Sequence, residues 1–112
     1  MDETPLYIFW RWLSLLESEF QSRLIKEIKD RFPGVIVLKN DSSYCQGIPD
    51  LIILWRDRWA ALECKKDRFA RCRPNQQYYV DEMNEMAFAA IIYPENKEDI
   101  LFELEYYFRG CL

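Results

Sequence analysis

The fold is decided by the stretch Gln46–Lys66, which reads QGIPDLIILW, then a polar break RDR, then WAALECKK. Its two apolar runs, Leu51–Trp55 and Trp59–Leu62, are short and rich in Ile, Leu and Trp. Such runs predict two buried β-strands that pair across a tight turn. Asp50 opens the first strand and Glu63 closes the second, so pairing brings two carboxylates to one edge of the sheet.

The charge at this edge suggests a metal site. Alternation along the strand puts Glu63 and Lys65 on one face and Cys64 on the other. Charged groups at the rim of a core cost free energy unless they are paired, and two carboxylates suit a hard cation such as Mg²⁺ or Mn²⁺. A lysine beside the metal can orient a water whose pKa the metal lowers. The alternative is a hairpin with solvated ends, in which Lys65 only neutralises the carboxylates.

These residues carry a family resemblance. Pro49-Asp50 followed by Glu63-Cys64-Lys65 resembles the Pro-Asp…(Asp/Glu)-x-Lys signature of the restriction-endonuclease-like, or PD-(D/E)xK, nuclease superfamily. The wider context, Gly47-Ile48 before the first pair and Pro74-Asn75-Gln76 downstream, is similar to its VRR-NUC family, whose short stand-alone members bacteriophages often carry. The resemblance covers roughly residues 17–93. It implies an α/β fold, with a central mixed sheet flanked by helices, and nuclease activity.

Composition narrows the functional classes. The chain has 112 residues, half of them apolar, which fits one ordered domain with a modest core. It has no histidine, which excludes histidine-based catalysis and histidine-ligated zinc. The cysteines form no Cys-x-x-Cys pair, so a zinc site would need long-range convergence. With no secretory signal, we expect reduced thiols and a cytoplasmic protein of a bacterium or phage-infected cell. The four cysteines are Cys45, Cys64, Cys72 and Cys111.

The net charge of −4 argues at first against nucleic-acid binding, but the charge is unevenly distributed. Residues 1–38 carry a net charge of −1, residues 39–78 carry +3 and residues 79–112 carry −6. Phosphate binding depends on local charge, and two acids of the middle segment, Asp50 and Glu63, are proposed metal ligands. The middle segment therefore remains a candidate for contact with DNA.

The chain begins with an apolar segment, residues 1–16, ahead of a single nuclease domain predicted over residues 17–112. Its run Leu6–Leu16 is interrupted by Arg11 and is too short to cross a membrane. We expect this segment to pack or to mediate self-association.

A helix is predicted over residues 17–32 and ends at Pro33-Gly34. Glu17 falls on its apolar stripe, whereas Glu19 falls on the polar side. The resemblance implies a glutamate from the first helix at the metal site, and Glu17 is the matching position. The alternative is a first-turn acid favoured by the helix dipole. The stripe consists of Phe20, Leu24, Ile28 and Phe32.

Two polar segments beside the predicted hairpin supply candidates for DNA contact. One is the loop over residues 39–46, for which a plain surface loop is an equal alternative. The other, Lys65–Arg73, has five positive charges and one negative charge, and an incoming phosphodiester would meet it directly. We favour backbone contact over a solvated face, while a single interleaved aromatic gives little support for base stacking. The candidates are Lys39, Tyr44, Gln46, Lys66, Arg68, Arg71 and Arg73.

A second helix begins at Pro74, where proline is well tolerated. Gln76 shares its apolar stripe and points toward the sheet, and the resemblance assigns a glutamine here to the active site. The alternative is a buried amide that caps strand backbone. The stripe continues through Val80, Met83 and Ala87.

A strand over residues 88–93 and a last helix capped by Asn96 complete the chain. The packing face of this helix consists of Ile100, Leu101, Leu104 and Phe108, and its other side is acidic. The predicted order is α-β-β-β-α-β-α, a restriction-endonuclease-like core with a central mixed sheet flanked by helices.

Our first hypothesis is a metal-dependent DNA endonuclease that hydrolyses phosphodiester bonds. Asp50, Glu63 and Glu17 bind Mg²⁺ or Mn²⁺, and the carbonyl of Cys64 is a further ligand. Lys65 positions the attacking water, and Gln76 orients that water or Lys65. No sequence-reading module is recognisable, which favours branched or junction DNA. Cutting two strands calls for two sites, so we expect a homodimer, with no membrane and no small-molecule cofactor.

Our second hypothesis is a non-catalytic module with a nuclease fold that binds DNA or a protein partner, for example a phage-encoded inhibitor. The acidic last third and several aromatic side chains could form its binding surface. The intact Asp50, Glu63 and Lys65 argue against it. The aromatic side chains are Tyr7, Phe9, Trp10, Trp12, Tyr106 and Tyr107.

Overall fold

The computed structural model describes residues 6–41 and 43–110 and shows a mixed α/β fold. Within these residues, three helices and four strands follow one another in the order that the sequence predicts. They are α1 (Leu6–Arg31), β1 (Ile36–Lys39), β2 (Leu51–Trp55), β3 (Arg58–Cys64), α2 (Pro74–Met86), β4 (Phe88–Ile92) and α3 (Lys97–Arg109).

The strands form one mixed sheet in the order β1-β2-β3-β4. The first three strands are antiparallel, whereas β4 runs parallel to β3, which requires a crossover connection that α2 provides. The predicted hairpin is confirmed, with Leu51 opposite Leu62 and Trp55 opposite Arg58. Its turn is tighter than the polar break suggested, because Arg58 already pairs in the strand and Arg56 takes a positive φ of 58°.

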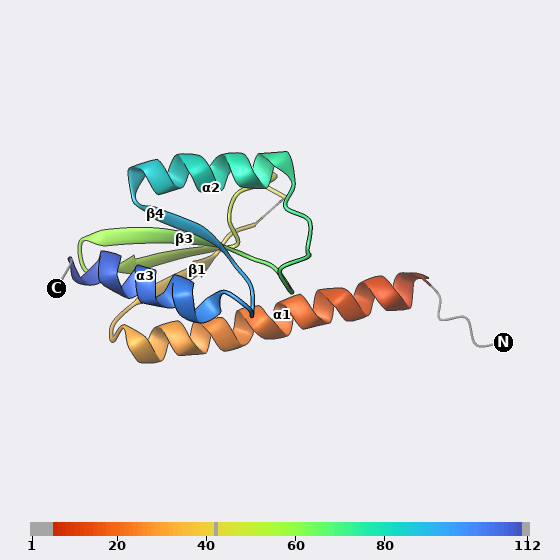
Figure 1. The fold of residues 1–112 in the computed structure, drawn as a ribbon, viewed down its shortest axis with the longest axis horizontal. Coiled ribbons are helices and arrows are strands. Elements are labelled where there is room, and N and C mark those ends of the chain that lie inside the picture. Colours follow the sequence, from red (N-terminus) through yellow and green to blue (C-terminus); the bar gives the residue numbers. More distant parts are fainter. Residues whose placement is uncertain (1–5, 42, 111–112) are drawn as a thin grey trace.

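Helices cover both faces of the sheet (Figure 1): α2 lies on one face, and α1 and α3 lie on the other. The alternation along β3 follows from this arrangement. Leu62 and Cys64 join the main core against α1 and α3, while Ala61 joins a smaller cluster beneath Val80 of α2. Glu63 lies between Leu62 and Cys64 in the strand, so its side chain projects to the α2 face. This is the face that carries the candidate site.

Helix α1 begins eleven residues earlier than predicted, at Leu6 instead of Glu17, and the boundary predicted at residue 17 falls inside it. No glycine or proline stands between Leu6 and Arg31 to stop a helix, and the apolar run simply continues it. The C-terminal half packs as predicted, with Leu24 and Ile28 fully buried. The N-terminal half projects beyond the sheet (Figure 1). Residues 1–5 of the predicted segment lie outside the described residues.

Asn96 precedes α3 as predicted, but its side chain does not cap that helix. Its Oδ1 accepts a hydrogen bond from the backbone N–H of Tyr93 at 2.8 Å, and its Nδ2 donates to the carbonyl of Ile91 at 3.0 Å. The side chain therefore fixes the end of β4 and not the first turn of the helix. The predicted packing face of α3 is confirmed, since Leu101 and Leu104 are fully buried. Among the described residues, no helix is long and apolar enough to cross a membrane.

Candidate active site

Asp50 and Glu63 lie side by side at the open end of the β2–β3 hairpin. Each stands one residue beyond the Leu51–Leu62 pair, at the start of one strand and near the end of the other. The backbone N–H of Cys64 donates a hydrogen bond to Oδ2 of Asp50 at 2.9 Å, which holds this carboxylate against β3. Strand pairing alone thus brings the two carboxylates together.

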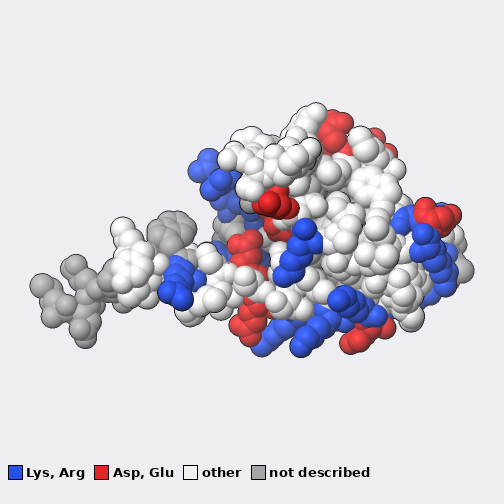
Figure 2. All heavy atoms as spheres, turned by 180° about the vertical axis from the view of Figure 1, so that it is seen from behind, with Lys and Arg blue, Asp and Glu red and all other residues white. Residues whose placement is uncertain are grey.

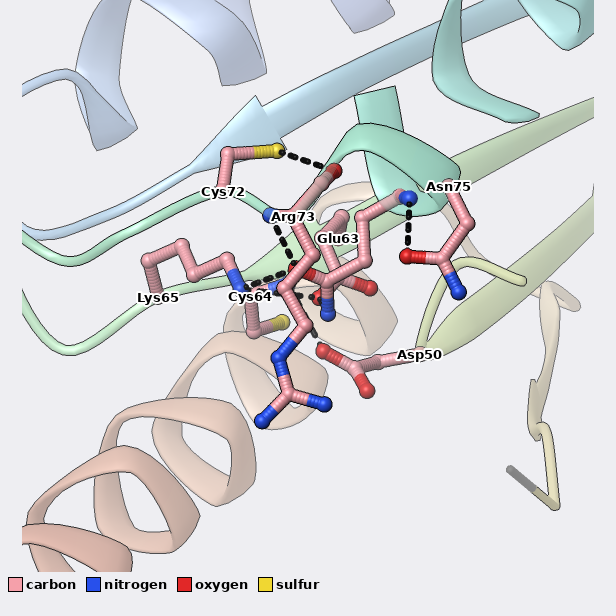
Figure 3. A network of polar contacts seen from close by, with 8 residues as sticks. Asp50, Glu63, Cys64, Lys65, Cys72, Arg73 and Asn75 are labelled. Carbon is pink, nitrogen blue, oxygen red and sulfur yellow. Dashed lines mark hydrogen bonds and ion pairs between the residues drawn. The ribbon is translucent and has the colours of Figure 1, made fainter. Parts of the chain in front are cut away.

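Lys65 and Gln76 complete a closed polar network with Glu63. The ammonium of Lys65 lies 3.4 Å from Oε2 of Glu63 and donates to Oε1 of Gln76 at 2.8 Å. Nε2 of Gln76 donates to the same Glu63 oxygen at 2.9 Å. Glu63 is 2% exposed and Lys65 is 8% exposed, so the network is shielded from bulk water. Figure 3 shows Lys65 and the carboxylates of Glu63 and Asp50 converging near the start of α2.

Gln76 also anchors its own helix. Its Oε1 accepts a hydrogen bond from the backbone N–H of Arg73 at 3.0 Å, at the residue that precedes Pro74. This contact satisfies one of the backbone donors near the helix start. Instead of capping a strand, as the alternative proposed, the amide joins the helix start to the two charged side chains of β3.

The carboxylates of Asp50 and Glu63 are buried close together, so their negative charges are unfavourable. Oε1 of Glu63 is buried without a hydrogen-bond partner, which is costly for a carboxylate. Burial, and then the neighbouring Asp50 carboxylate, raise the pKa of Glu63 to about 7 despite the opposing charge of Lys65. Burial also raises the pKa of Asp50, although the Cys64 N–H and Lys65 favour its charged form. A proton or a cation at this pair relieves the repulsion.

Glu17 approaches the same region from α1. Burial raises its pKa, with a further contribution from Asp50, while Lys65 and Lys66 act in the opposite direction. Within the described residues, however, no three Asp, Glu or Cys side chains lie close enough to enclose a metal ion. Glu17 nevertheless lines the same pocket as the Asp50–Glu63 pair. Such a pair still fits Mg²⁺, which is usually bound by one or two carboxylates and keeps several waters.

A pocket of about 1080 Å³ opens above these residues, between α1 and the loops on either side of the hairpin. In Figure 2, acidic atoms lie in a hollow beside the projecting helix, with basic side chains next to them. Four of the predicted DNA contacts line the pocket: Gln46, Lys66, Arg71 and Arg73. The other three, Lys39, Tyr44 and Arg68, lie outside its lining.

Sequence reasoning missed part of this lining. Phe9, Leu13 and Ser14 of α1 belong to the pocket wall, although the segment before Glu17 was set apart from the nuclease domain. A signal was present, because Phe9, Leu13 and Glu17 follow one another at four-residue intervals on one side of a helix.

The contact between Gly47 and Asn75 was also missed. Gly47 has a φ of +92°, and a Cβ there would lie 2.8 Å from the side chain of Asn75. Gly47 therefore supplies both a left-handed backbone and room for the Asn75 side chain to approach closely. From the sequence, Asn75 is only part of the Pro74-Asn75-Gln76 motif.

The cysteines have separate surroundings. Cys64 is buried in the core, where burial raises the pKa of its thiol. Cys45 lies 3.3 Å from the hydroxyl of Tyr79, and the thiol of Cys72 points to the carbonyl of Arg73 (Figure 3). These three are free thiols, and Cys111 lies outside the described residues.

Comparison of the sequence with models of known protein families finds no match, and comparison with curated proteins finds none either. The motif residues and their geometry are therefore the basis on which a function can be inferred.

Proposed function

We propose that this chain is a metal-dependent DNA endonuclease with a restriction-endonuclease-like core of the VRR-NUC type. The observation that carries the proposal is the buried Glu63, which has one carboxylate oxygen without a partner and the other bound to Gln76 and close to Lys65. An acid with a raised pKa beside a second acid and a lysine, in a pocket with basic residues, is a typical active-site arrangement.

Asp50 and Glu63 are the residues that would hold Mg²⁺ or Mn²⁺, with Glu17 approaching from α1 and the Cys64 carbonyl as a further ligand. A bound ion of this kind supplies a Lewis acid and lowers the pKa of a coordinated water. The unpartnered oxygen of Glu63 and the raised pKa values of both acids support this assignment, since a divalent cation offsets the mutual repulsion.

We propose that Lys65 positions the attacking water or contacts the phosphate. An ammonium has three N–H donors. Glu63 and Gln76 engage two of them, which leaves one for a water or a phosphate oxygen. Gln76 fixes the direction of this third donor, because its amide contacts both Lys65 and Glu63. We therefore assign Lys65 to the positioning of the water and Gln76 to the positioning of Lys65.

DNA is the proposed substrate because basic side chains share the pocket with the acids. Lys66, Arg71 and Arg73 line it together with Gln46 and would contact phosphates on either side of the cut. With no recognisable module for reading a sequence, we favour branched or junction DNA.

The test compares wild-type protein with Lys65→Ala on branched, duplex and single-stranded DNA, with Mg²⁺, Mn²⁺ or EDTA. We expect wild-type cleavage that EDTA abolishes, and at least a 100-fold loss in the variant, as is usual when one charge-stabilising donor is removed. Lys29→Ala is the matched control, because this exposed lysine of α1 lies outside the pocket, is not among the candidate DNA contacts and should leave cleavage within about twofold.

Circular dichroism would verify that each variant is folded. Folded wild-type protein that cuts none of these substrates with either metal would overturn the nuclease proposal. A search for DNA binding without cleavage, or for a protein partner, would then test the non-catalytic alternative.

We also propose that the chain is a homodimer that pairs through the projecting half of α1. This half exposes large apolar side chains, including Leu6, Tyr7, Trp12 and Leu15, which are 56–76% exposed. A helix that is apolar on most of its sides is usually buried against a partner. Sedimentation should give a dimer that Trp12→Glu converts to a monomer, and wild-type protein that sediments as a monomer at micromolar concentration, with and without DNA, would contradict this.

A further inference from the structure

The residues that line the pocket above the acids are of two chemical kinds, which we call the charged wall and the apolar wall. The charged wall consists of charged and hydrogen-bonding groups, among them Asp50, Glu63 and Lys65. The other is apolar and combines side chains of α1 with side chains of the basic loop after β3. Metal ions and phosphates account for the first wall but not for the second. The apolar residues are Phe9, Leu13, Phe69 and Ala70.

Phe69 is the most exposed residue of the apolar wall, at 79%. The turn that presents it is well held: its backbone N–H donates to Oδ1 of Asp67 at 2.8 Å, and the N–H of Arg68 donates to Glu95 at 3.3 Å. The guanidinium of Arg68 lies over the ring, 4.9 Å from its centroid. A single exposed aromatic is common on protein surfaces. This one is distinguished by its place beside the lysine and arginines of the pocket.

Phe9 contributes a second aromatic ring from another part of the chain. It is 48% exposed and lines the same pocket from the projecting half of α1, one turn before Leu13. Sequence reasoning found only one aromatic within the basic segment and therefore gave base stacking little support. The fold adds Phe9 to Phe69, so two separate elements present aromatic rings to one pocket that also holds basic and acidic groups.

These walls fit a nucleotide whose base is unpaired. In duplex DNA the phosphates lie outside and the bases are stacked inside, so a duplex meets the charged wall but offers no base to the apolar one. An unpaired nucleotide presents both, and aromatic side chains stack on bases of any sequence. We propose that the substrate has an unpaired nucleotide next to the scissile phosphate, as in a fork or flap, and that its base stacks on Phe69 while Phe9 closes the apolar wall. This inference rests on the proposed nuclease function.

A binding measurement tests the stacking without requiring cleavage. Single-stranded and forked DNA, with the fluorescent base 2-aminopurine beside the expected cut, is titrated with protein in EDTA. Stacking on an aromatic ring should quench the fluorescence. Phe69→Ala should weaken single-strand binding about 5- to 150-fold and abolish the quenching, Phe9→Ala should act in the same direction, and binding to a fully paired duplex should hardly change.

Phe102→Ala is the matched control, because Phe102 is 69% exposed on α3 and lies outside the pocket lining. It should behave as wild type. Equal loss of binding in Phe102→Ala and Phe69→Ala, or an equal loss on duplex and single-stranded DNA, would overturn the stacking inference.

Cleavage assays with Mg²⁺ or Mn²⁺ separate this inference from the proposed function. If wild-type and Phe69→Ala proteins cut forked and paired DNA with the same preference, the stacking inference fails and the nuclease stands. If Phe69-dependent quenching is found but no DNA is cut, base stacking stands and the nuclease proposal fails.

Discussion

The charged groups at the two ends of the β2–β3 hairpin differ in whether they have favourable partners. At the turn, the guanidinium of Arg109 lies 5.0 Å from the ring centroid of Trp55, and Nη1 of Arg58 donates to the carbonyl of Tyr107 at 2.7 Å. At the open end, Asp50 and Glu63 crowd together, and one oxygen of Glu63 has no partner. The charged groups at the turn therefore have stabilising partners, whereas the two carboxylates at the open end repel each other. Unfavourable electrostatics of this kind are typical of functional sites.

The largest effect on stability should come from Trp55→Ala at the turn end. Trp55 is 4% exposed, packs 5.1 Å from Phe32 between ring centroids, and donates from its indole to the carbonyl of Pro33 at 2.8 Å. Its loss should reduce the free energy of unfolding by about 3–5 kcal/mol, measured by urea denaturation. DNA cleavage by the fraction that remains folded should stay near the wild-type level.

Trp55→Phe serves as the control for this end, because it keeps an aromatic ring and removes the indole hydrogen bond, with a smaller loss of stability. Loss of cleavage in folded Trp55→Ala would show that the two ends are not independent.

A substitution at the open end of the hairpin should raise the stability of the metal-free protein instead of lowering it. Glu63→Gln removes a buried negative charge but keeps the shape, and Gln76 and Lys65 can still donate to the amide oxygen. Metal-free protein should melt at a higher temperature than wild type, while cleavage should fall at least 100-fold because one metal ligand is lost. Calorimetry in EDTA and a cleavage assay check the two outcomes. If Glu63→Gln is less stable than wild type in EDTA, the charge of Glu63 does not destabilise the metal-free protein and the inferred repulsion from Asp50 is contradicted.

The smallest expected effect is the pH dependence of stability without metal. The pKa of Glu63 is raised from 4.5 to about 7, so the folded protein binds a proton that the unfolded chain releases. Its stabilising contribution is therefore present below pH 4.5 and is lost as the pH rises through about 7. The pKa values of Asp50 and Glu17 are also raised and act in the same direction.

Melting temperatures in EDTA between pH 4.5 and 8 measure this dependence. The gap between Glu63→Gln and wild type should widen as the pH rises, and Mn²⁺ should narrow it above pH 7 by stabilising wild type alone. A gap that is constant across this range would contradict the raised pKa of Glu63.

The contrast between the hairpin ends also explains what the sequence could predict. The strands, their pairing and the edge shared by Asp50 and Glu63 follow from short apolar runs around a tight turn. The orientation of Gln76 follows from its position on a helical stripe. Each of these features involves only residues of one or two adjacent elements, and the periodicity of apolar residues is sufficient to place them.

Other features depend on contacts between distant segments. Nothing local shows that Oε1 of Glu63 is buried without a partner, or that Asn75 contacts Gly47. The start of α1 was misplaced because Leu6–Leu16 is apolar on most sides and gives no single stripe to align with the rest of the helix. For the same reason, the presence of Phe9 in the same pocket as Phe69 became visible only in the folded chain.

The hydrogen bond from the backbone N–H of Arg73 to Gln76 makes the site depend on the first turn of α2. Terminal turns of helices fray far more often than whole domains unfold. Each time the first turn of α2 opens, Gln76 withdraws from Lys65 and Glu63 together, and the ammonium loses its fixed direction. The amide proton of Arg73 therefore reports on the assembly of the site, and its protection against hydrogen exchange measures the fraction of time for which the site is assembled.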